Sequence, residues 1–227
     1  HDWNAISLNN NSGVPLYNKK FINKVQYNNF EQIVDSIDSD TAAVIMEPII
    51  FEFPEKNYLS KIRKITKQKK ILLIFDEMWT GFRLHIGGAQ KYFKVDADLA
   101  CYSKAIANGM PLSILAGKKK IINSLNEKSF FYTTFGGETL SLAAAINTID
   151  YIKKNNVCNK IQVNGFNLQK KLIQILKNNN INFIKIVGYG SRCMFLISHE
   201  KSQIIKTFIH QEMLINGILW NGIINLS

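Results

Sequence analysis

The stretch "ILLIFDEMWTGFR" (71–83) runs from apolar residues directly into two carboxylates, Asp76 and Glu77. A short continuous apolar run of this kind is typical of a strand buried in a parallel sheet. In open α/β sheets, ligands bind beyond the carboxyl ends of the strands. We therefore expect Asp76 to lie at the edge of the sheet where a functional site forms.

Apolar strands and amphipathic helices alternate on both sides of this stretch. Further strands are expected at 42–50, 98–104 and 112–117, and helices at 57–70, 138–156 and about 161–176. After the segment 178–182 we expect strands at 183–190 and 193–200 and a helix near 202–215. The pattern predicts an α/β large domain over residues 1–155, with a mostly parallel sheet and helices on both faces. The start of a small α+β domain is expected over residues 156–227.

The composition limits the class of function. The chain has 227 residues and a formal net charge of +11, but its 28 Lys and Arg residues are scattered or form short runs on predicted helices. It carries no zinc-finger, RNP-like or helix-turn-helix signature, so we expect no nucleic-acid partner. No apolar run reaches the ~20 residues that a membrane span needs, so we expect no membrane partner.

The cysteines Cys101, Cys158 and Cys193 lie far apart and form no CxxC or Cys/His cluster. This spacing predicts free thiols, no metal site and a reducing, cytoplasmic location. The sequence begins at His1 rather than at Met. We expect it to be an internal segment of a longer protein.

An apolar strand that ends in Asp-Glu suits two chemistries, of which the first is nucleotide hydrolysis. In a P-loop ATPase the acids hold Mg²⁺, but such a site also needs the phosphate loop G-x-x-x-x-G-K-[ST]. The stretch "GKKK" (117–120) lacks the first glycine and the hydroxyl residue. A P-loop ATPase fragment whose phosphate loop lies outside this sequence stays open as an alternative.

The second chemistry is that of pyridoxal phosphate. This cofactor needs a lysine amine, a carboxylate against its pyridine nitrogen and donors for its phosphate. Lys104 ends the next clear strand after Asp76, and "TTFGG" (133–137) precedes the helix expected at 138–156. A helix start favours an anion, and a lysine partly removed from water has a lowered pKa. The chain thus offers all three groups in order.

Four segments carry a resemblance to a known family: "AAVIMEPI" (42–49), "LLIFDEMWTGFR" (72–83), "DLACYSKAIANGMPL" (98–112) and "YTTFGGETLSLAAA" (132–145). Together and in this order they resemble the class III pyridoxal-phosphate-dependent aminotransferases of fold type I. The nearest branch is the one that resembles glutamate-1-semialdehyde 2,1-aminomutase. In that family the phosphate loop and the aromatic residue that stacks on the cofactor precede the position of His1.

The resemblance implies roles for four residues. Lys104 is expected to form the Schiff base with the cofactor and to move the substrate proton, while Asp76 pairs with the pyridine nitrogen. Met78 is expected to pack on one face of the ring. Thr134 matches the threonine that reaches the phosphate of the neighbouring subunit's cofactor, which implies a homodimer with shared active sites.

Two further positions are expected to face the substrate. Glu52 matches the glutamate that pairs with an active-site arginine in some aminotransferases of this class and that aminomutases often lack, so it favours transamination; the sequence does not identify its arginine partner. Trp79 stands where the family usually has a non-aromatic residue, which reshapes the substrate pocket. Of the remaining residues, we expect Glu77 to orient a neighbouring loop and Tyr189 to pack. For Arg83 we expect a structural ion pair or cap, with binding of a substrate carboxylate as the alternative.

The function implied by the resemblance is transfer of an amino group between a small amino compound and a keto or aldehyde acceptor, through Lys104 and pyridoxal 5′-phosphate. Intramolecular amino transfer of the glutamate-1-semialdehyde 2,1-aminomutase type is the alternative within the family. A P-loop ATPase fragment and a non-catalytic degenerate copy are the alternatives of another class.

Overall fold

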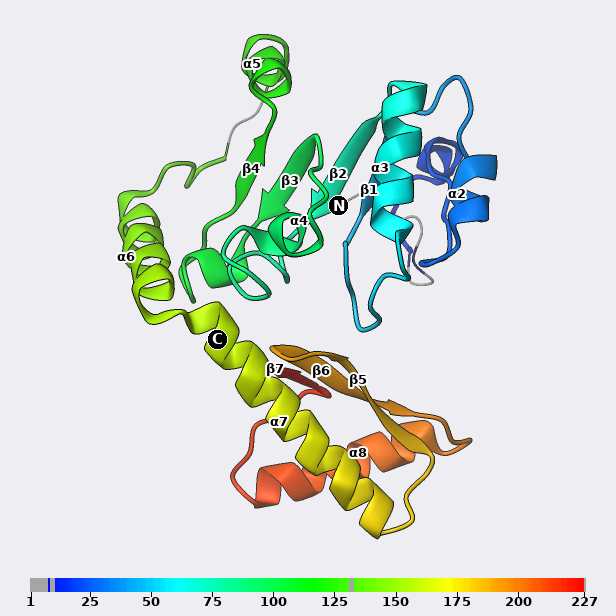
Figure 1. The fold of residues 1–227 in the computed structure, drawn as a ribbon, viewed down its shortest axis with the longest axis vertical. Coiled ribbons are helices and arrows are strands. Elements are labelled where there is room, and N and C mark those ends of the chain that lie inside the picture. Colours follow the sequence, from blue (N-terminus) through cyan, green and yellow to red (C-terminus); the bar gives the residue numbers. More distant parts are fainter. Residues whose placement is uncertain (1–7, 9–10, 131–132, 227) are drawn as a thin grey trace.

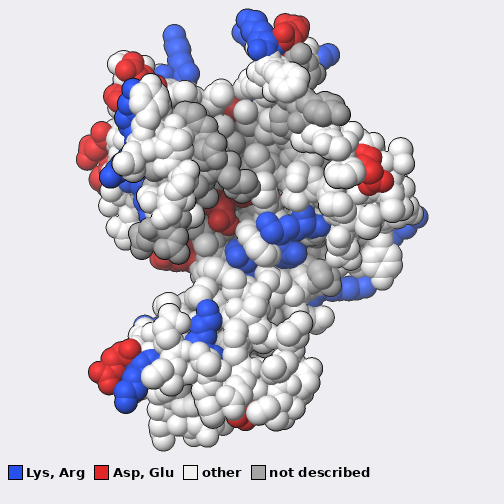
Figure 2. Space-filling view, turned by 180° about the vertical axis from the view of Figure 1, so that it is seen from behind, with Lys and Arg blue, Asp and Glu red and all other residues white. Residues whose placement is uncertain are grey.

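The computed structural model of the protein describes Leu8 and residues 11–130 and 133–226. Two sheets organise the described chain, and the long helix α7 (Val157–Asn178) connects them (Figure 1). Lys and Arg side chains lie in several separate groups on the face shown in Figure 2, rather than in one continuous patch. In the part of the chain that the structure describes, no helix combines the length and hydrophobicity that crossing a membrane requires.

The first sheet has four strands in the order β1-β2-β3-β4. β1 (Ala43–Met46), β2 (Leu72–Asp76) and β3 (Leu99–Tyr102) are parallel, and β4 (Ile114–Gly117) runs antiparallel to β3. This confirms the predicted α/β class with a mostly parallel sheet. Because β2 lies between two parallel neighbours, its carboxyl end is flanked by the carboxyl ends of β1 and β3.

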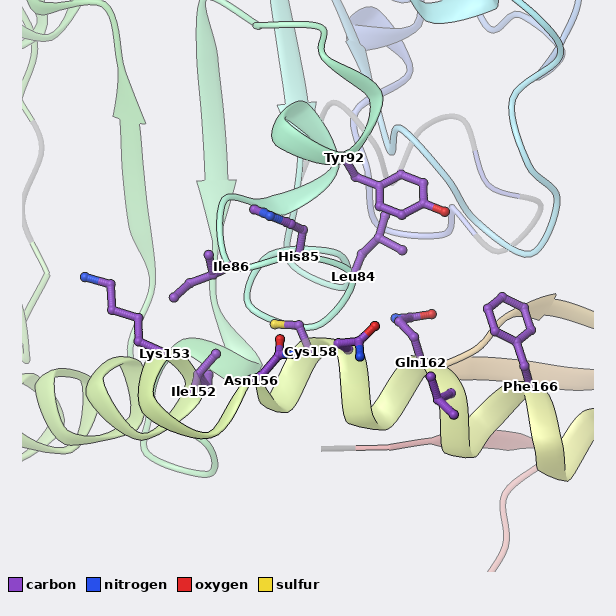
Figure 3. Close-up of a pocket in the computed structure, with 12 residues that line it drawn as sticks. Leu84, His85, Ile86, Tyr92, Ile152, Lys153, Asn156, Cys158, Gln162 and Phe166 are labelled. Carbon is purple, nitrogen blue, oxygen red and sulfur yellow. The ribbon is translucent and has the colours of Figure 1, made fainter.

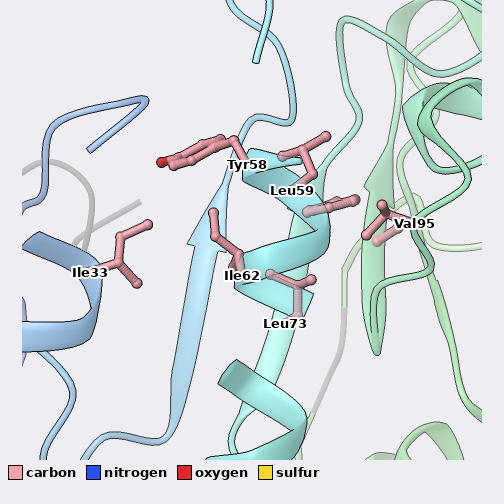
Figure 4. Packing of buried hydrophobic residues seen from close by; sticks show 8 residues of the cluster. Ile33, Tyr58, Leu59, Ile62, Leu73 and Val95 are labelled. Carbon is pink, nitrogen blue, oxygen red and sulfur yellow. The ribbon is translucent and has the colours of Figure 1, made fainter. Parts of the chain in front are cut away.

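Helices precede, connect and follow the strands of the first sheet. They are η1 (Leu16–Phe21), α2 (Phe30–Asp35), α3 (Tyr58–Lys69), α4 (Gly88–Phe93), η2 (Lys104–Ile106), α5 (Lys119–Lys128) and α6 (Thr139–Asn155). α3 presents Tyr58, Leu59 and Ile62 at helical spacing to Leu73 and Phe75 of β2 (Figure 4). Full burial of a side chain of this size contributes roughly 1.5–3 kcal/mol, so this cluster is a main source of stability for the sheet.

The second sheet is antiparallel, in the order β5-β6-β7. It contains β5 (Ile184–Tyr189), β6 (Arg192–Ile197) and β7 (Ile223–Asn225), and α8 (Ser202–Ile215) lies between β6 and β7 in the sequence. The backbone of α7 approaches the β5–β6 turn so closely that a Cβ at Gly165 would lie 1.5 Å from the Gly190 carbonyl oxygen. Only glycine at position 165 fits this contact.

α7 begins at Val157, earlier than the expected start near Ile161. The reason is Asn156, whose left-handed backbone (φ 50°) ends α6 and lets a new helix begin at the next residue. Asparagine tolerates this conformation better than other side chains. The helical periodicity read from the sequence missed the first turn of α7, because the break occupies only one residue.

Asp98, at the amino end of β3, joins three elements. Its buried carboxylate accepts hydrogen bonds from the Arg63 guanidinium at 2.7 Å and from the Leu73 N–H at 2.8 Å, and it pairs with Lys118. Burial acts to raise the pKa of the Asp98 carboxyl, but these hydrogen bonds outweigh it and lower the pKa to about 2. Asp98 therefore stabilises the fold only while it is ionised.

Asp98→Asn is expected to lower the free energy of unfolding by roughly 3 kcal/mol at pH 7, because it leaves the buried Arg63 charge without a partner. In the wild-type protein, the contribution of Asp98 is present above pH 4 and falls as the pH drops towards 2, because the folded-state pKa lies below the unfolded one. Urea unfolding between pH 2 and 7 tests both points. Lys118→Met, which removes a largely exposed partner, should cost under about 1 kcal/mol. Equal losses in the two variants would contradict this account.

Candidate active site

Three candidate side chains come together because β1, β2 and β3 are parallel. Asp76 is the last residue of β2, Lys104 follows β3 after Ser103, and Glu47 follows β1 directly. Asp76 is in register with Cys101 of β3. The sequence predicted Asp76 and Lys104 at this edge of the sheet. It did not single out Glu47, although Glu47 also directly follows an apolar strand.

Lys104 has an unusual backbone and a partly buried amine. Its φ of 52° lies in the left-handed region, where a non-glycine residue costs on the order of 1 kcal/mol. Its Nζ lies 4.2 Å from the centroid of the Trp79 ring. Burial lowers the pKa of the Lys104 amine, and the positive charges of Arg192 and Arg83 add to this effect. Asp76 and Glu47 act in the opposite direction.

The Asp76 carboxylate turns the chain at the end of β2. Its Oδ1 accepts a hydrogen bond of 2.9 Å from the Met78 N–H. This contact fixes the start of the segment 77–83, which carries Met78 and Trp79. Glu47 is half-buried, and its Oε2 has no hydrogen-bond partner among the described residues. Burial raises the pKa of the Glu47 carboxyl, and the negative charge of Asp76 raises it further.

Glu77 holds the loop after β2 in place. Its fully buried carboxylate accepts hydrogen bonds from Thr80 Oγ1 at 2.5 Å, the Ala89 N–H at 2.6 Å and the Gln90 N–H at 3.0 Å. Gly88, at φ 67°, leaves the space for it: a Cβ there would lie 2.4 Å from the Glu77 carboxylate. The structure thus gives Glu77 the loop-orienting position that the sequence suggested.

Glu77→Gln is expected to lower the free energy of unfolding by about 2–3 kcal/mol, because the amide NH₂ would face groups that are themselves donors. The loop that carries Trp79 should loosen as well, which should raise the rate of amide hydrogen exchange over residues 77–90. Thermal unfolding and hydrogen exchange of the variant measure the two effects. Glu127→Gln, at an exposed position on α5, is the matched control and should change neither. A fully stable Glu77→Gln protein would show that the three hydrogen bonds contribute little.

Arg83 and Tyr189 both bind the backbone of Trp79. Arg83 Nη1 donates to the Trp79 carbonyl oxygen at 3.0 Å, and its Nε donates to the Leu226 carbonyl oxygen at 3.2 Å. The Tyr189 hydroxyl also donates to the Trp79 carbonyl oxygen, at 3.3 Å. Burial raises the pKa of Tyr189 to about 12, so the hydroxyl stays protonated at neutral pH. Arg83 therefore serves as a cap, as expected, whereas Tyr189 positions Trp79 in addition to packing.

Arg192, the first residue of β6, is a site residue that the sequence did not indicate. Its guanidinium carbon lies 3.9 Å from the centroid of the Trp79 ring and 4.4 Å from that of Phe51. Its side chain is buried, and burial lowers the pKa of its guanidinium. No motif around "GSRCM" (190–194) predicted the contact of Arg192 with Trp79, because this segment belongs to a different sheet.

Two predicted site residues have no described contact with Asp76 or Lys104. Glu52 is exposed in the loop after β1, and its negative charge acts on Tyr27 rather than on Lys104. Thr134 is exposed in the turn before α6. In the same segment, the Glu138 side chain caps α6 by accepting hydrogen bonds from the Leu140 and Ser141 N–H groups. Neither residue is brought against Asp76 or Lys104 by a described contact.

A separate cavity of about 520 Å³ lies between the segment 84–92 and the helices α6 and α7. Figure 3 shows Leu84, His85, Cys158, Gln162 and Phe166 among its lining residues. Asp76, Trp79 and Lys104 do not line it. The described residues also contain no cluster of three or more His, Cys, Asp or Glu side chains that suits a metal ion. The strand ends around Asp76 and Lys104 therefore remain the candidate active site.

Comparison with known proteins agrees with this geometry. The chain is 36% identical over 180 residues to glutamate-1-semialdehyde 2,1-aminomutase of Methanococcoides burtonii, an alignment that covers 75% of this chain and 43% of that protein. It is 32% identical over 227 residues to the same enzyme of Methanosarcina acetivorans, covering 91% of this chain and 53% of that protein. The chain thus spans about half the length of the curated relatives it matches.

Its fold is similar to that of the FumI protein of Sphingopyxis sp. MTA144, solved in its PLP internal aldimine form. The TM-score is 0.85, the identity is 21%, and the match covers 94% of this chain and 53% of that one. The sequence profile described as aminotransferase class-III matches residues 6–224. With nearly all of its length inside that profile, the chain belongs to the class III aminotransferase family.

Proposed function

We propose that this chain forms part of a pyridoxal-phosphate-dependent aminotransferase, which moves an amino group between a small amino compound and a keto or aldehyde acceptor. The observation that carries the proposal is the meeting of Asp76 and Lys104 at neighbouring strand ends, with the Lys104 amine partly buried. These residues fit the cofactor: an amine of lowered pKa suits its aldehyde, and a carboxylate suits its pyridine nitrogen.

When bound, pyridoxal phosphate supplies an electron-withdrawing ring that stabilises negative charge at the substrate carbon. Lys104 provides the amine that holds the cofactor and moves the proton at the substrate Cα. Burial and the neighbouring arginines favour the neutral form of the Lys104 amine, which both cofactor attachment and proton removal require. Asp76 provides the negative charge that keeps the pyridine nitrogen protonated. Trp79 covers Lys104 Nζ and excludes water from that side.

Other roles come from the family resemblance. We assign Met78 to one face of the cofactor ring, and its place directly after Asp76 supports this assignment. We assign Thr134 to the phosphate of a partner subunit's cofactor, for which its exposure supplies the access. Glu52 and Trp79 are assigned to the substrate. These roles imply a homodimer with shared sites.

We also place the protein in the cytoplasm, with no nucleic-acid or membrane partner. The three cysteines are free in the structure, which suits a reducing compartment. We divide the chain into a large domain over residues 1–155 and the start of a small domain over residues 156–227. In support, α6 ends at Asn155 and α7 packs against the second sheet.

The second candidate function is intramolecular amino transfer, because the two relatives compared above are named glutamate-1-semialdehyde 2,1-aminomutase. An aminomutase converts a single amino substrate without a separate acceptor, whereas an aminotransferase needs both partners. Assays with and without an added keto acid separate the two. Membership of the aminotransferase family leaves no support for the P-loop ATPase alternative, and that interpretation of the Asp-Glu strand end was wrong.

The proposed function is tested on the full-length protein with pyridoxal phosphate, by visible absorption before and after borohydride reduction and by mass mapping of the labelled peptide. We expect an absorption band that reduction fixes as a label on Lys104. Because the pKa of Lys104 is lowered, its labelling should persist at neutral pH, where exposed lysines react little. A label spread over surface lysines would favour the remaining alternative, a non-catalytic degenerate copy.

A further inference from the structure

A second cavity lies at the edge of the first sheet that is opposite the candidate active site. Its volume is about 330 Å³, at the lower end of the range of roughly 300–1,000 Å³ that ligand pockets occupy. The end of α3, the amino ends of β2 and β3 and the start of α5 form it. Figure 1 shows α5 beyond the carboxyl end of β4, at the other end of the first sheet from α7. The proposed function makes no use of this region.

Cations dominate the lining of this cavity, which we call the basic cavity. Its charged lining residues are five cations and one carboxylate: Arg63, Lys67, Lys70, Lys118, Lys120 and Asp98. The carboxylate is already shared, because Asp98 pairs with Arg63 and Lys118. The other three lysines form no ion pair with a described carboxylate. Since a cleft lined mainly by charges of one sign concentrates ions of the opposite sign, the basic cavity favours an anion.

Arg63 gives the basic cavity a buried donor whose position is fixed. The residue is 8% exposed, and its Nη1 donates to Asp98 Oδ2 at 2.7 Å. Its Nε is also buried and has no hydrogen-bond partner among the described residues. A buried donor without an acceptor is unfavourable, and an anion in the cavity would supply the acceptor. Because Asp98 holds the guanidinium in place, the site does not depend on flexible lysine side chains alone.

The start of α5 adds partial positive charge to the same lining. This helix of 10 residues begins at Lys119, and Lys120 and Ile121 of its first turn line the cavity. The first turn has no side-chain cap and no acidic residue. The first N–H groups of a helix lack acceptors inside the helix and attract anions, phosphate groups among them. The basic cavity therefore combines a helix start, a buried arginine and several lysines, all of which suit phosphate oxygens.

We propose that the basic cavity binds a small anion of the di- or triphosphate type. A single phosphate group carries a charge of about −1.5 to −2 at pH 7, which is too little to balance five cations against one carboxylate. Inorganic di- or triphosphate and the phosphate chain of a nucleotide share the required chemistry. The stretch "GKKK" (117–120) lacks the phosphate loop of a nucleotide-hydrolysing site, so the anion is bound and not hydrolysed. This binding is independent of the proposed amino transfer.

Binding is tested on the full-length, cofactor-loaded protein with inorganic triphosphate and with ATP. Bound cofactor keeps its own phosphate in the active site, so the probes cannot occupy that position. Isothermal titration without Mg²⁺, at an ionic strength of about 0.15 M that screens weak surface contacts, should show one triphosphate bound per chain. The Tm should rise with triphosphate concentration, because the anion binds the folded state. Equal affinities would assign the site to the phosphate chain alone, and tighter binding of ATP would assign it to a nucleotide. Failure of both probes to bind would overturn the proposal.

The double variant Lys67→Gln/Lys120→Gln should weaken triphosphate binding by at least about tenfold, because it removes two charged donors. Both lysines are exposed, so the Tm without triphosphate should stay near that of wild type. Lys64→Gln/Lys128→Gln is the matched control: it changes the net charge equally on the same two helices, at exposed positions outside the cavity lining. The control should bind triphosphate like wild type. Equal losses in the two double variants would indicate attraction to net charge alone and would overturn the proposal.

Hydrogen exchange locates the bound anion without reference to activity. Triphosphate should slow the exchange of amides at the start of α5, over residues 118–122, because their N–H groups then contact the anion. The segment 133–139 before α6 should be unchanged. Slower exchange at 133–139 with no effect at 118–122 would place the anion in the expected phosphate site of the cofactor and would overturn the inference.

Discussion

Lys104→Ala is expected to lower amino transfer by at least about 1,000-fold. Removal of the amine deletes both the covalent attachment of the cofactor and the group that moves the substrate proton. The substitution should leave the surrounding packing intact, because the buried residues of this turn are Ala105, Ile106 and Ala107. The loss should therefore appear in kcat while the fold is retained. Single-turnover rates and thermal unfolding of the cofactor-loaded variant measure the two quantities.

Lys119→Ala is the matched control, because Lys119 is exposed at the start of α5. It should retain wild-type turnover and leave the borohydride label on Lys104 unchanged. In Lys104→Ala, the label should disappear from the peptide that contains residue 104. Substantial turnover by Lys104→Ala would remove Lys104 from the mechanism and would redirect attention to another amine.

Asp76→Asn is expected to slow removal of the substrate proton by about 100- to 10,000-fold. Asparagine is nearly isosteric, and its carbonyl oxygen can still accept the Met78 N–H that Oδ1 accepts in the structure. The chain turn after β2 should therefore survive, and only the negative charge is lost. Without that charge the pyridine nitrogen is no longer held protonated, so the ring withdraws electrons less well.

The kinetic isotope effect of a donor deuterated at Cα shows which step is affected, because it should increase when proton removal becomes limiting. The pKa of Lys104 should also fall further in Asp76→Asn, since the Asp76 charge acts to raise it. Asp96→Asn, at an exposed position before β3, is the control and should leave both quantities unchanged. A wild-type rate in Asp76→Asn would show that another group sets the protonation of the cofactor.

Local pattern was sufficient to predict much of the fold. The apolar runs that became β1, β2 and β3 are continuous, as is typical of strands in a parallel sheet, and this signal needs only neighbouring residues. The helix α3 followed from its periodicity, and α6 from its alanine content and its basic C-terminal end. The start of α7 was not predicted correctly. The single left-handed residue Asn156 separates α6 from α7, and a break of one residue leaves no clear signal in the sequence.

The candidate site divides in the same way. Asp76 and Lys104 were predictable because each ends or directly follows an apolar strand, and the resemblance supplied their expected chemistry. Glu47 carried the same signal and lies within the segment 42–49, but it was assigned no role. Arg192 carried none: a lone arginine on a short strand looks like any solvated cation until its surroundings are known.

The sequence by itself thus determined the class of the fold, the family, and the two residues at the strand ends, since these depend on short patterns along the chain. Only the tertiary structure decided that Lys104 and Arg192 both contact the Trp79 ring. It also decided that Arg83 and Tyr189 hold Trp79 there through its carbonyl oxygen. The physical reason is that these contacts join residues far apart in the sequence. Burial and charge at the site arise when the second sheet packs beside the first, and no local pattern specifies that contact.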